Sequence, residues 1–128
     1  AVAGDLAAGD APRGEAGWTI EIAPESGAAE TIVCVNQAVS TSGGSVQWVE
    51  IDGVRYAHIV DPRTGLGATA LAQVTVVGPL DCAVDALSTA LSLCGGHADA
   101  ADEIARILRR FPGYRARVEH AGVARWLP

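Results

Sequence analysis

Apolar and polar residues alternate along several short stretches in the first half of the chain, which is the period of a β-strand with one buried face. The clearest of these stretches are Trp18–Ala23 and Thr31–Val35, which are separated by a turn of small and polar residues. We expect Asn36–Gly44 to form a further short strand that ends in a glycine turn. Residues 1–16 are mostly small, so loops are expected there after a candidate opening strand.

The strongest local signal is a β-hairpin in the middle of the chain. Two alternating runs, Val46–Ile51 and Val54–Val60, flank the dipeptide Asp52–Gly53, which favours a type I′ turn. After a turn and a loop, Leu71–Val77 is expected to form another strand.

The period then changes from two residues to that of a helix. Asp81–Leu93 has helical spacing, with Asp81 as the expected N-cap and Gly95 as the expected stop. A second amphipathic helix is expected over Ala98–Phe111, because acidic residues open it and arginines close it, as the helix dipole favours. The apolar positions of the first helix are Ala83, Ala86, Leu87, Ala90, Leu91 and Cys94.

Two final segments, RARVE and VARWL, alternate again around a glycine turn. The order of elements is therefore β-rich and then α-α-β-β, which predicts an α+β fold. We expect two helices packed on a largely antiparallel sheet that contains the Val46–Val60 hairpin.

Composition narrows the possible classes of protein. The 128 residues suggest one domain, and 49% of them are hydrophobic, as in a globular chain. The net charge is −6, which argues against general nucleic-acid binding because that needs a basic surface. No apolar run approaches the length of a membrane span, and no signal peptide is recognisable. The three cysteines, Cys34, Cys82 and Cys94, are expected to be small buried apolar residues.

The first expected helix carries a polar stripe. Asp85, Ser88, Thr89 and Ser92 are spaced to lie on one helix face. A carboxylate and a hydroxyl one turn apart offer hard oxygens of the kind that Mg²⁺ binds. The alternative is an ordinary solvated helix face.

A second group of polar residues follows the hairpin. His58 near a strand end is a candidate general base, or else a half-buried histidine bonded to the backbone. Asp61 before Pro62 either takes part in a site or only shapes the turn, and Arg63 either binds phosphate or is solvated. The STSGG segment offers backbone N–H groups to an anion.

Taken in order, three segments resemble the C-terminal half of the ApbE family, the FAD:protein FMN transferases. They are AVSTSGG, YAHIVDPRTG and VTVVGPLDCAVDALSTALSLCG, of which HxxDPxTG and DALxT are the specific parts. VAGDLAAGD followed by WTIEIA is also similar to that family's Gly-Gly-Asp segment and next strand, with Ala3 in place of the first glycine. The resemblance covers almost the whole chain and implies part of an ApbE-like domain related to the T-fold.

The resemblance implies an activity and a set of residues. Such enzymes bind FAD and a divalent cation, usually Mg²⁺, and transfer FMN to a threonine on an acceptor protein. His58 matches the histidine that activates the acceptor hydroxyl. The implied metal ligands are Asp85, Ser88 and Thr89, and the implied nucleotide-binding residues are Ser42, Gly43, Ile59 and Asp61.

Family members are more than twice as long, which implies that residues 1–128 form a single domain from the C-terminal portion of a transferase. The chain holds no Met, which also suggests a fragment or a processed product. The half that it lacks would carry a further metal ligand, much of the FAD pocket and any lipoprotein signal, and the resemblance implies a periplasmic or membrane-anchored location. Two hypotheses stay open. One is an Mg²⁺-dependent FMN transferase, present here as a C-terminal fragment or a half-length homologue, whose missing half or self-association would complete it. The other is a non-catalytic fragment or degenerate homologue that binds a flavin nucleotide weakly or serves as an assembly domain. A third, minor idea makes Thr69, in TGLGAT, a flavinylation site.

Overall fold

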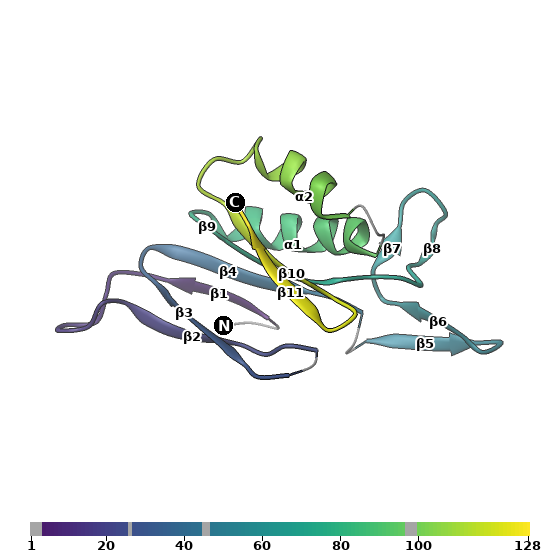
Figure 1. Cartoon of the computed structure of the whole chain (residues 1–128), viewed down its shortest axis with the longest axis horizontal. Coiled ribbons are helices and arrows are strands. Elements are labelled where there is room, and N and C mark those ends of the chain that lie inside the picture. Colours follow the sequence, from purple (N-terminus) through teal and green to yellow (C-terminus); the bar gives the residue numbers. More distant parts are fainter. Residues whose placement is uncertain (1–3, 26, 45–46, 97–99) are drawn as a thin grey trace.

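The computed structural model describes residues 4–25, 27–44, 47–96 and 100–128 (Figure 1). Its strands are β1 (Asp5–Ala8), β2 (Trp18–Ile22), β3 (Glu30–Cys34), β4 (Gln37–Ser42), β5 (Trp48–Ile51), β6 (Val54–Ala57), β7 (Val60–Asp61), β8 (Leu66–Gly67), β9 (Gln73–Gly78), β10 (Arg115–His120) and β11 (Val123–Leu127). Its helices are α1 (Asp81–Gly95) and α2 (Ala100–Leu108).

A five-stranded sheet in the order β1-β4-β9-β10-β11 forms the centre of the molecule. Every neighbouring pair in it is antiparallel. The predicted α+β fold with a largely antiparallel sheet and two helices is therefore confirmed.

The two helices cover one face of this sheet (Figure 1). The strand period of two sends alternate residues of the central strands toward them, and these residues are small or β-branched, which suits close packing of a helix on a sheet. The buried residues of this core are Ala38, Ala72, Val74, Val76, Val84, Leu87, Leu91, Ala100, Ile104, Leu108, Ala116 and Val118.

The hairpin of β2 and β3 covers the opposite face of the sheet. Its inward residues Ile22, Ile32 and Cys34 pack against Val39 of β4 and Val77 of β9. The central sheet is therefore covered on both faces, and β9 is accordingly buried along almost its whole length.

The expected place of the middle hairpin is wrong. β5 and β6 form a separate two-stranded sheet, and the two helices pack on the five-stranded sheet instead. The β5–β6 ladder ends at the pair of Trp48 and Ala57, beyond which the backbone N–H of His58 still donates to the carbonyl of Gln47. β7 and β8 then make another small pair. The turn itself is as predicted, with Asp52 and Gly53 both at positive φ (52° and 77°). Val46 lies outside the described residues.

The helix ends differ slightly from expectation. Leu80 occupies the N-cap of α1, and Asp81 is its first residue, whose side chain accepts a hydrogen bond from the N–H of Cys82 (2.7 Å). Gly95 belongs to α1, and Gly96 is the C-cap. α2 is shorter than expected, and residues 97–99 lie outside the described part. Neither helix, as far as the chain is described, is long and apolar enough to cross a membrane.

Candidate functional site

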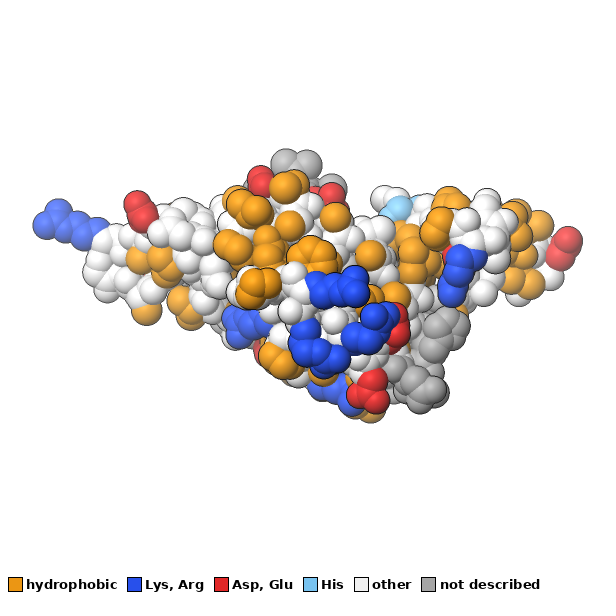
Figure 2. All heavy atoms as spheres, turned by 90° about the horizontal axis from the view of Figure 1, so that it is seen from above, with side chains coloured by type: hydrophobic (Ala, Val, Ile, Leu, Met, Phe, Trp, Pro, Cys, Tyr) orange, Lys and Arg blue, Asp and Glu red, His pale blue; other side chains and the backbone are white. Residues whose placement is uncertain are grey.

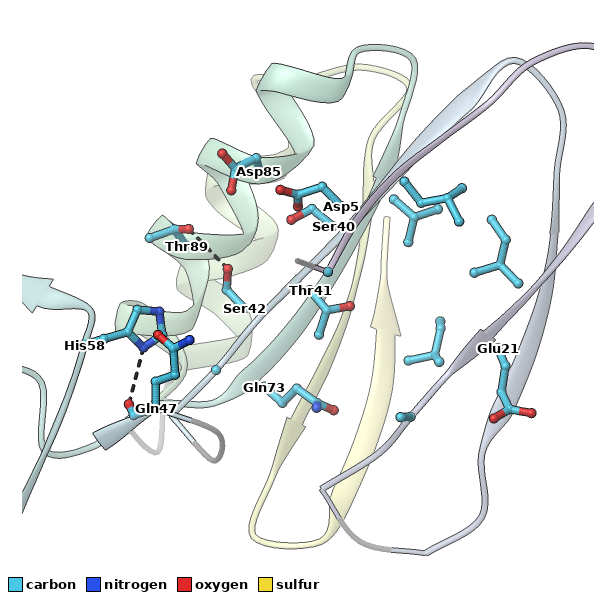
Figure 3. A pocket seen from close by; sticks show the side chains of 17 residues that line it. Asp5, Glu21, Ser40, Thr41, Ser42, Gln47, His58, Gln73, Asp85 and Thr89 are labelled. Atoms are coloured by element: carbon cyan, nitrogen blue, oxygen red, sulfur yellow. Dashed lines mark hydrogen bonds between the residues drawn. The ribbon is translucent and has the colours of Figure 1, made fainter. Parts of the chain in front are cut away.

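A cavity of about 540 Å³ opens beside the end of β4, near the start of β1, whose first residue Asp5 pairs with Ser40 (Figure 3). One wall is α1, another is the β2–β3 hairpin, and Gln47 and His58 close one end. Residues far apart in the sequence therefore meet here.

The wall nearest α1 is rich in oxygen atoms. Asp85 and Thr89 are one turn apart on α1 and both line the cavity. Asp5 joins them from β1, because its register partner is Ser40, whose side chain points at α1. Figure 3 shows the Asp5 and Asp85 carboxylates on facing elements of this wall. Two carboxylates and a hydroxyl are hard donors.

Hydroxyl groups connect β4 to α1 beside these carboxylates. Ser42 Oγ lies 3.1 Å from Thr89 Oγ1 and 2.9 Å from Ser88 Oγ. Ser40 Oγ lies 3.0 Å from Ser88 Oγ, and Ser88 Oγ donates to the carbonyl of Asp85 at 3.0 Å. Of the predicted binding residues, Ser42 and Gly43 line the cavity.

The expected polar stripe on α1 is only half present. Ser88 and Ser92 are fully buried under the helix, whereas Asp85 is exposed and Thr89 is half-buried in the cavity wall. Each buried serine donates to a carbonyl three residues earlier, which satisfies its proton and lets it fit an apolar interface. Ser88 therefore lies away from the cavity, and the structure does not place it with the expected metal ligands.

His58 reaches the cavity from the segment between β6 and β7. It is exposed rather than half-buried, and its Nδ1 lies 3.3 Å from the carbonyl oxygen of Gln47. A carbonyl only accepts, so Nδ1 carries the proton and the neutral ring keeps its lone pair on Nε2. This nitrogen is the one available to take a proton.

The far half of the cavity has a different character. Leu6, Ile20, Ile22 and Val39 give it apolar walls beneath the β2–β3 hairpin. Gln73 of β9 borders this half, and its buried Oε1 has no hydrogen-bond partner among the described residues. A flat apolar group with a polar edge fits such a surface.

Two predicted binding residues lie elsewhere. Ile59 is buried at 7% exposure and does not line the cavity. Asp61 forms the expected Asx-type turn, since its Oδ1 accepts the N–H of Arg63 at 2.9 Å, and its carboxylate also pairs with the Arg63 guanidinium. Both residues of this ion pair line a second groove, which lies between α1, α2 and the β7–β8 turn. Figure 2 shows that arginines gather on this helical side of the molecule.

Thr69, the candidate acceptor, is exposed in the loop before β9. It borders a small groove with Trp48 and Arg55, and it does not line the cavity of His58. The structure therefore keeps this threonine apart from the candidate base.

Sequence reasoning did not name Asp5 or Gln73 as site residues. Asp5 had a signal, because it ends the segment that resembles the family's Gly-Gly-Asp motif. Gln73 had none, since it is an ordinary polar position in a predicted strand. Within the described ranges no cluster of three or more His, Cys, Asp or Glu side chains is placed to hold a metal ion. A cation here would thus have few protein ligands, which is the usual state of Mg²⁺ shared with a phosphate.

Comparison with known proteins identifies the family of this chain. The model of the ApbE family matches residues 1–118. The FAD:protein FMN transferase of Treponema pallidum is 36% identical over 118 residues, which is 88% of this chain and 31% of that protein. The corresponding Escherichia coli K12 transferase is 34% identical over 83 residues, which is 61% of this chain and 24% of that protein.

Solved structures agree with these sequence matches. The ApbE protein of Thermotoga maritima superposes with a TM-score of 0.79 at 28% identity, covering 97% of this chain and 40% of that one. The apo form of the Pseudomonas stutzeri flavinyl transferase ApbE gives a TM-score of 0.72 at 26% identity, covering 98% and 40%. The chain thus spans about two fifths of these structures. With the family model matching residues 1–118 and the fold in agreement, the chain belongs to the ApbE family.

Proposed function

We propose that the intact protein is an Mg²⁺-dependent FAD:protein FMN transferase and that this chain supplies one half of its active site. The observation that carries the proposal is the single cavity that brings Asp5, Asp85 and Thr89 together with His58. The transferase names of the matched relatives support the reaction class. The family resemblance also favours a periplasmic or membrane-anchored location for the intact protein.

The residues present fit the metal that the family implies. Asp5 and Asp85 offer carboxylates and Thr89 offers a hydroxyl, all on the same wall of the cavity. When bound, Mg²⁺ would neutralise charge on the pyrophosphate of FAD. The remaining ligands would come from water, from the substrate phosphates or from a segment outside this chain.

His58 supplies the base in this proposal. Its Nδ1–H is held by the Gln47 carbonyl, so Nε2 accepts the proton of the acceptor threonine. The freed threonine oxygen bonds to the phosphorus of the FMN half of FAD, and the bond between that phosphorus and the AMP oxygen breaks. FMN then sits on the threonine as a phosphoester, AMP leaves, and the proton stays on His58. Ser42 and Gly43 at the end of β4 line the path of the phosphates.

The alternative function is a domain without catalytic activity of its own. The partial span of the match is compatible with it, because the matched transferases continue well beyond the matched region. Such a domain would bind a flavin nucleotide weakly or assemble with a partner, and the cavity would then serve binding alone.

A transfer assay separates these functions. The intact protein would be mixed with FAD, Mg²⁺ and an acceptor carrying the target threonine, and covalent flavin would be read by in-gel fluorescence. We expect labelling that is abolished by EDTA and by Asp85→Ala. Asp102→Ala is the matched control, because Asp102 is an exposed acid near the start of α2 that does not line the cavity. Labelling that survives both EDTA and Asp85→Ala would refute the metal-dependent mechanism, and no labelling by the wild type would favour the binding domain.

A further inference from the structure

The hydroxyl groups between β4 and α1 form a continuous hydrogen-bonded chain. It runs from Ser40 and Ser42 on β4 to Ser88, and from Ser42 to Thr89, with oxygen separations of 2.9–3.1 Å. Ser40 and Ser88 are almost completely buried, at 1% and 0% exposure. Water therefore cannot supply alternative partners to these two groups.

Only one arrangement of protons makes all four of these contacts, including the one from Ser88 to the Asp85 carbonyl, hydrogen bonds at once. The Asp85 carbonyl can only accept, so the single proton of Ser88 is committed to it. Ser88 then has only its two lone pairs left, and these accept from Ser40 and from Ser42. The proton of Ser42 is thereby used as well, which leaves its oxygen as the acceptor for Thr89.

The consequence reaches the cavity at Thr89. Its proton points to Ser42, so the side of Thr89 Oγ1 that faces the cavity carries lone pairs only. The neighbouring carboxylates of Asp5 and Asp85 are acceptors when ionised. This wall can therefore satisfy a cation or a hydrogen-bond donor, whereas an anion would meet only lone pairs.

We propose that Ser88 is a positioning residue that, through Ser42, orients the Thr89 hydroxyl to bind a divalent cation. This inference rests on the proposed function, because it concerns the cation site of that function. It gives the buried serine of the DALST segment a role that needs no contact with the metal. The role is directional, since an alanine at position 88 would release the Ser42 proton to point at Thr89.

The chain offers a matched control for this role on the same helix. Ser92 is also fully buried and donates to a carbonyl three residues earlier, at 2.8 Å. Its acceptor is the backbone of Thr89, and among the described residues its hydroxyl has no partner on β4. Ser92→Ala should therefore lose a similar packing and hydrogen-bond contribution without changing the Thr89 proton.

Direct Mn²⁺ binding by the intact protein in the presence of FAD, measured by electron paramagnetic resonance of the free ion, tests the inference without any turnover. We expect Ser88→Ala and Ser42→Ala each to weaken binding by roughly three- to tenfold, the worth of one hydrogen bond. The double variant should bind like either single variant, because both substitutions break the same relay, that is, the hydrogen bonds from Ser88 through Ser42 to Thr89. Ser92→Ala should stay within about twofold of the wild type. Ser42→Ala also provides the test if Ser88→Ala fails to fold, since Ser42 is only half-buried.

The outcomes separate the relay from the cation site. Weakening by Ser88→Ala and Ser42→Ala, but not by Ser92→Ala, supports the relay. Equal binding by the wild type and Ser88→Ala, with loss in Asp85→Ala, overturns the relay and leaves the proposed cation site in place. Equal loss in Ser92→Ala and Ser88→Ala also overturns the relay, because packing alone would then explain it. Binding that is unaffected by Asp85→Ala, or absent from the wild type, overturns both.

Discussion

Trp126 on β11 donates a 2.6 Å hydrogen bond from Nε1 to Oε1 of Glu30 on β3, 96 residues away in the sequence. The other carboxylate oxygen of Glu30 accepts from Arg117 Nε at 2.7 Å. Arg117 is buried at 4% exposure and also donates to the buried Glu119 at 2.9 Å. Glu30 thus links the β2–β3 hairpin, which forms one wall of the cavity, to strands β10 and β11 of the central sheet.

Stability should depend on pH through Glu30. The hydrogen bonds from Trp126 and Arg117 lower the pKa of this carboxyl below its ordinary value near 4.5. A lowered folded-state pKa means that the stabilisation is present above that ordinary value and is lost as the pH falls through the folded pKa. Because the Glu30 side chain is 39% exposed, solvent screens the interaction, and we expect Glu30→Gln to cost only about 1 kcal/mol at pH 7.

Urea unfolding at pH 7 and pH 4 measures this effect. Glu30→Gln should reduce the fall in the free energy of unfolding between the two pH values, and Glu15→Gln, at an exposed turn position, should not. The same pH dependence in Glu30→Gln and the wild type would show that Glu30 does not contribute to it.

Two ion pairs of similar length should differ greatly in their contribution to the free energy of unfolding. Glu119→Ala leaves the Arg117 charge buried with one partner fewer, and removing one partner of a buried pair costs about 3–5 kcal/mol. Glu103→Ala breaks the pair with Arg106, whose side chains are 48% and 54% exposed, and should cost at most about 1 kcal/mol. Chemical unfolding of both variants is the measurement, and equal losses would contradict the burial argument.

The buried pair also shows where sequence patterns stop being informative. The segment RARVE has the alternation of a strand, and β10 confirms it. On pattern alone its charged positions belong on a solvent face, yet Arg117 and Glu119 are buried and Arg115 stacks on Trp126 at 4.6 Å. The reason is tertiary: the β2–β3 hairpin covers that face and brings Glu30 to pair with the arginine.

For the candidate site, too, the sequence predicted the local features but not those that depend on tertiary packing. The period of α1 put Asp85 and Thr89 on one face because helical spacing is local. The burial of Ser88 depends on Ser40 and Ser42 of a distant strand, and the separation of the β5–β6 hairpin from the main sheet depends on which strands pair across the whole fold. Neither is encoded in a short window of sequence.

The cysteines should differ in reactivity. All three were expected to be buried, and Cys34 is, but Cys82 is exposed near the start of α1 and Cys94 is partly exposed. Burial raises the pKa of the Cys34 and Cys94 thiols, so a smaller fraction of each is thiolate at pH 8. We expect iodoacetamide to label Cys82 first in the native chain and all three residues in urea, as read by peptide mass spectrometry. Faster labelling of Cys34 than of Cys82 would contradict the packing of β3.

The last prediction concerns His58 in the intact protein. His58→Ala should slow flavin transfer by about 10²–10⁴-fold, which is the usual effect of losing a positioned general base. FAD binding should change little, because the histidine occupies one end of the cavity while the apolar walls and the carboxylates of Asp5 and Asp85 lie elsewhere. His120→Ala is the matched control, since His120 is an exposed histidine at the end of β10 that does not line the cavity.

Added imidazole should restore part of the lost rate in His58→Ala, because a diffusible base can take the threonine proton, whereas a purely structural loss would not respond. In-gel fluorescence of the acceptor, beside FAD titration by fluorescence quenching, measures both quantities. Transfer at the wild-type rate by His58→Ala would remove His58 from the chemistry and leave its ring with only its contact to the Gln47 carbonyl.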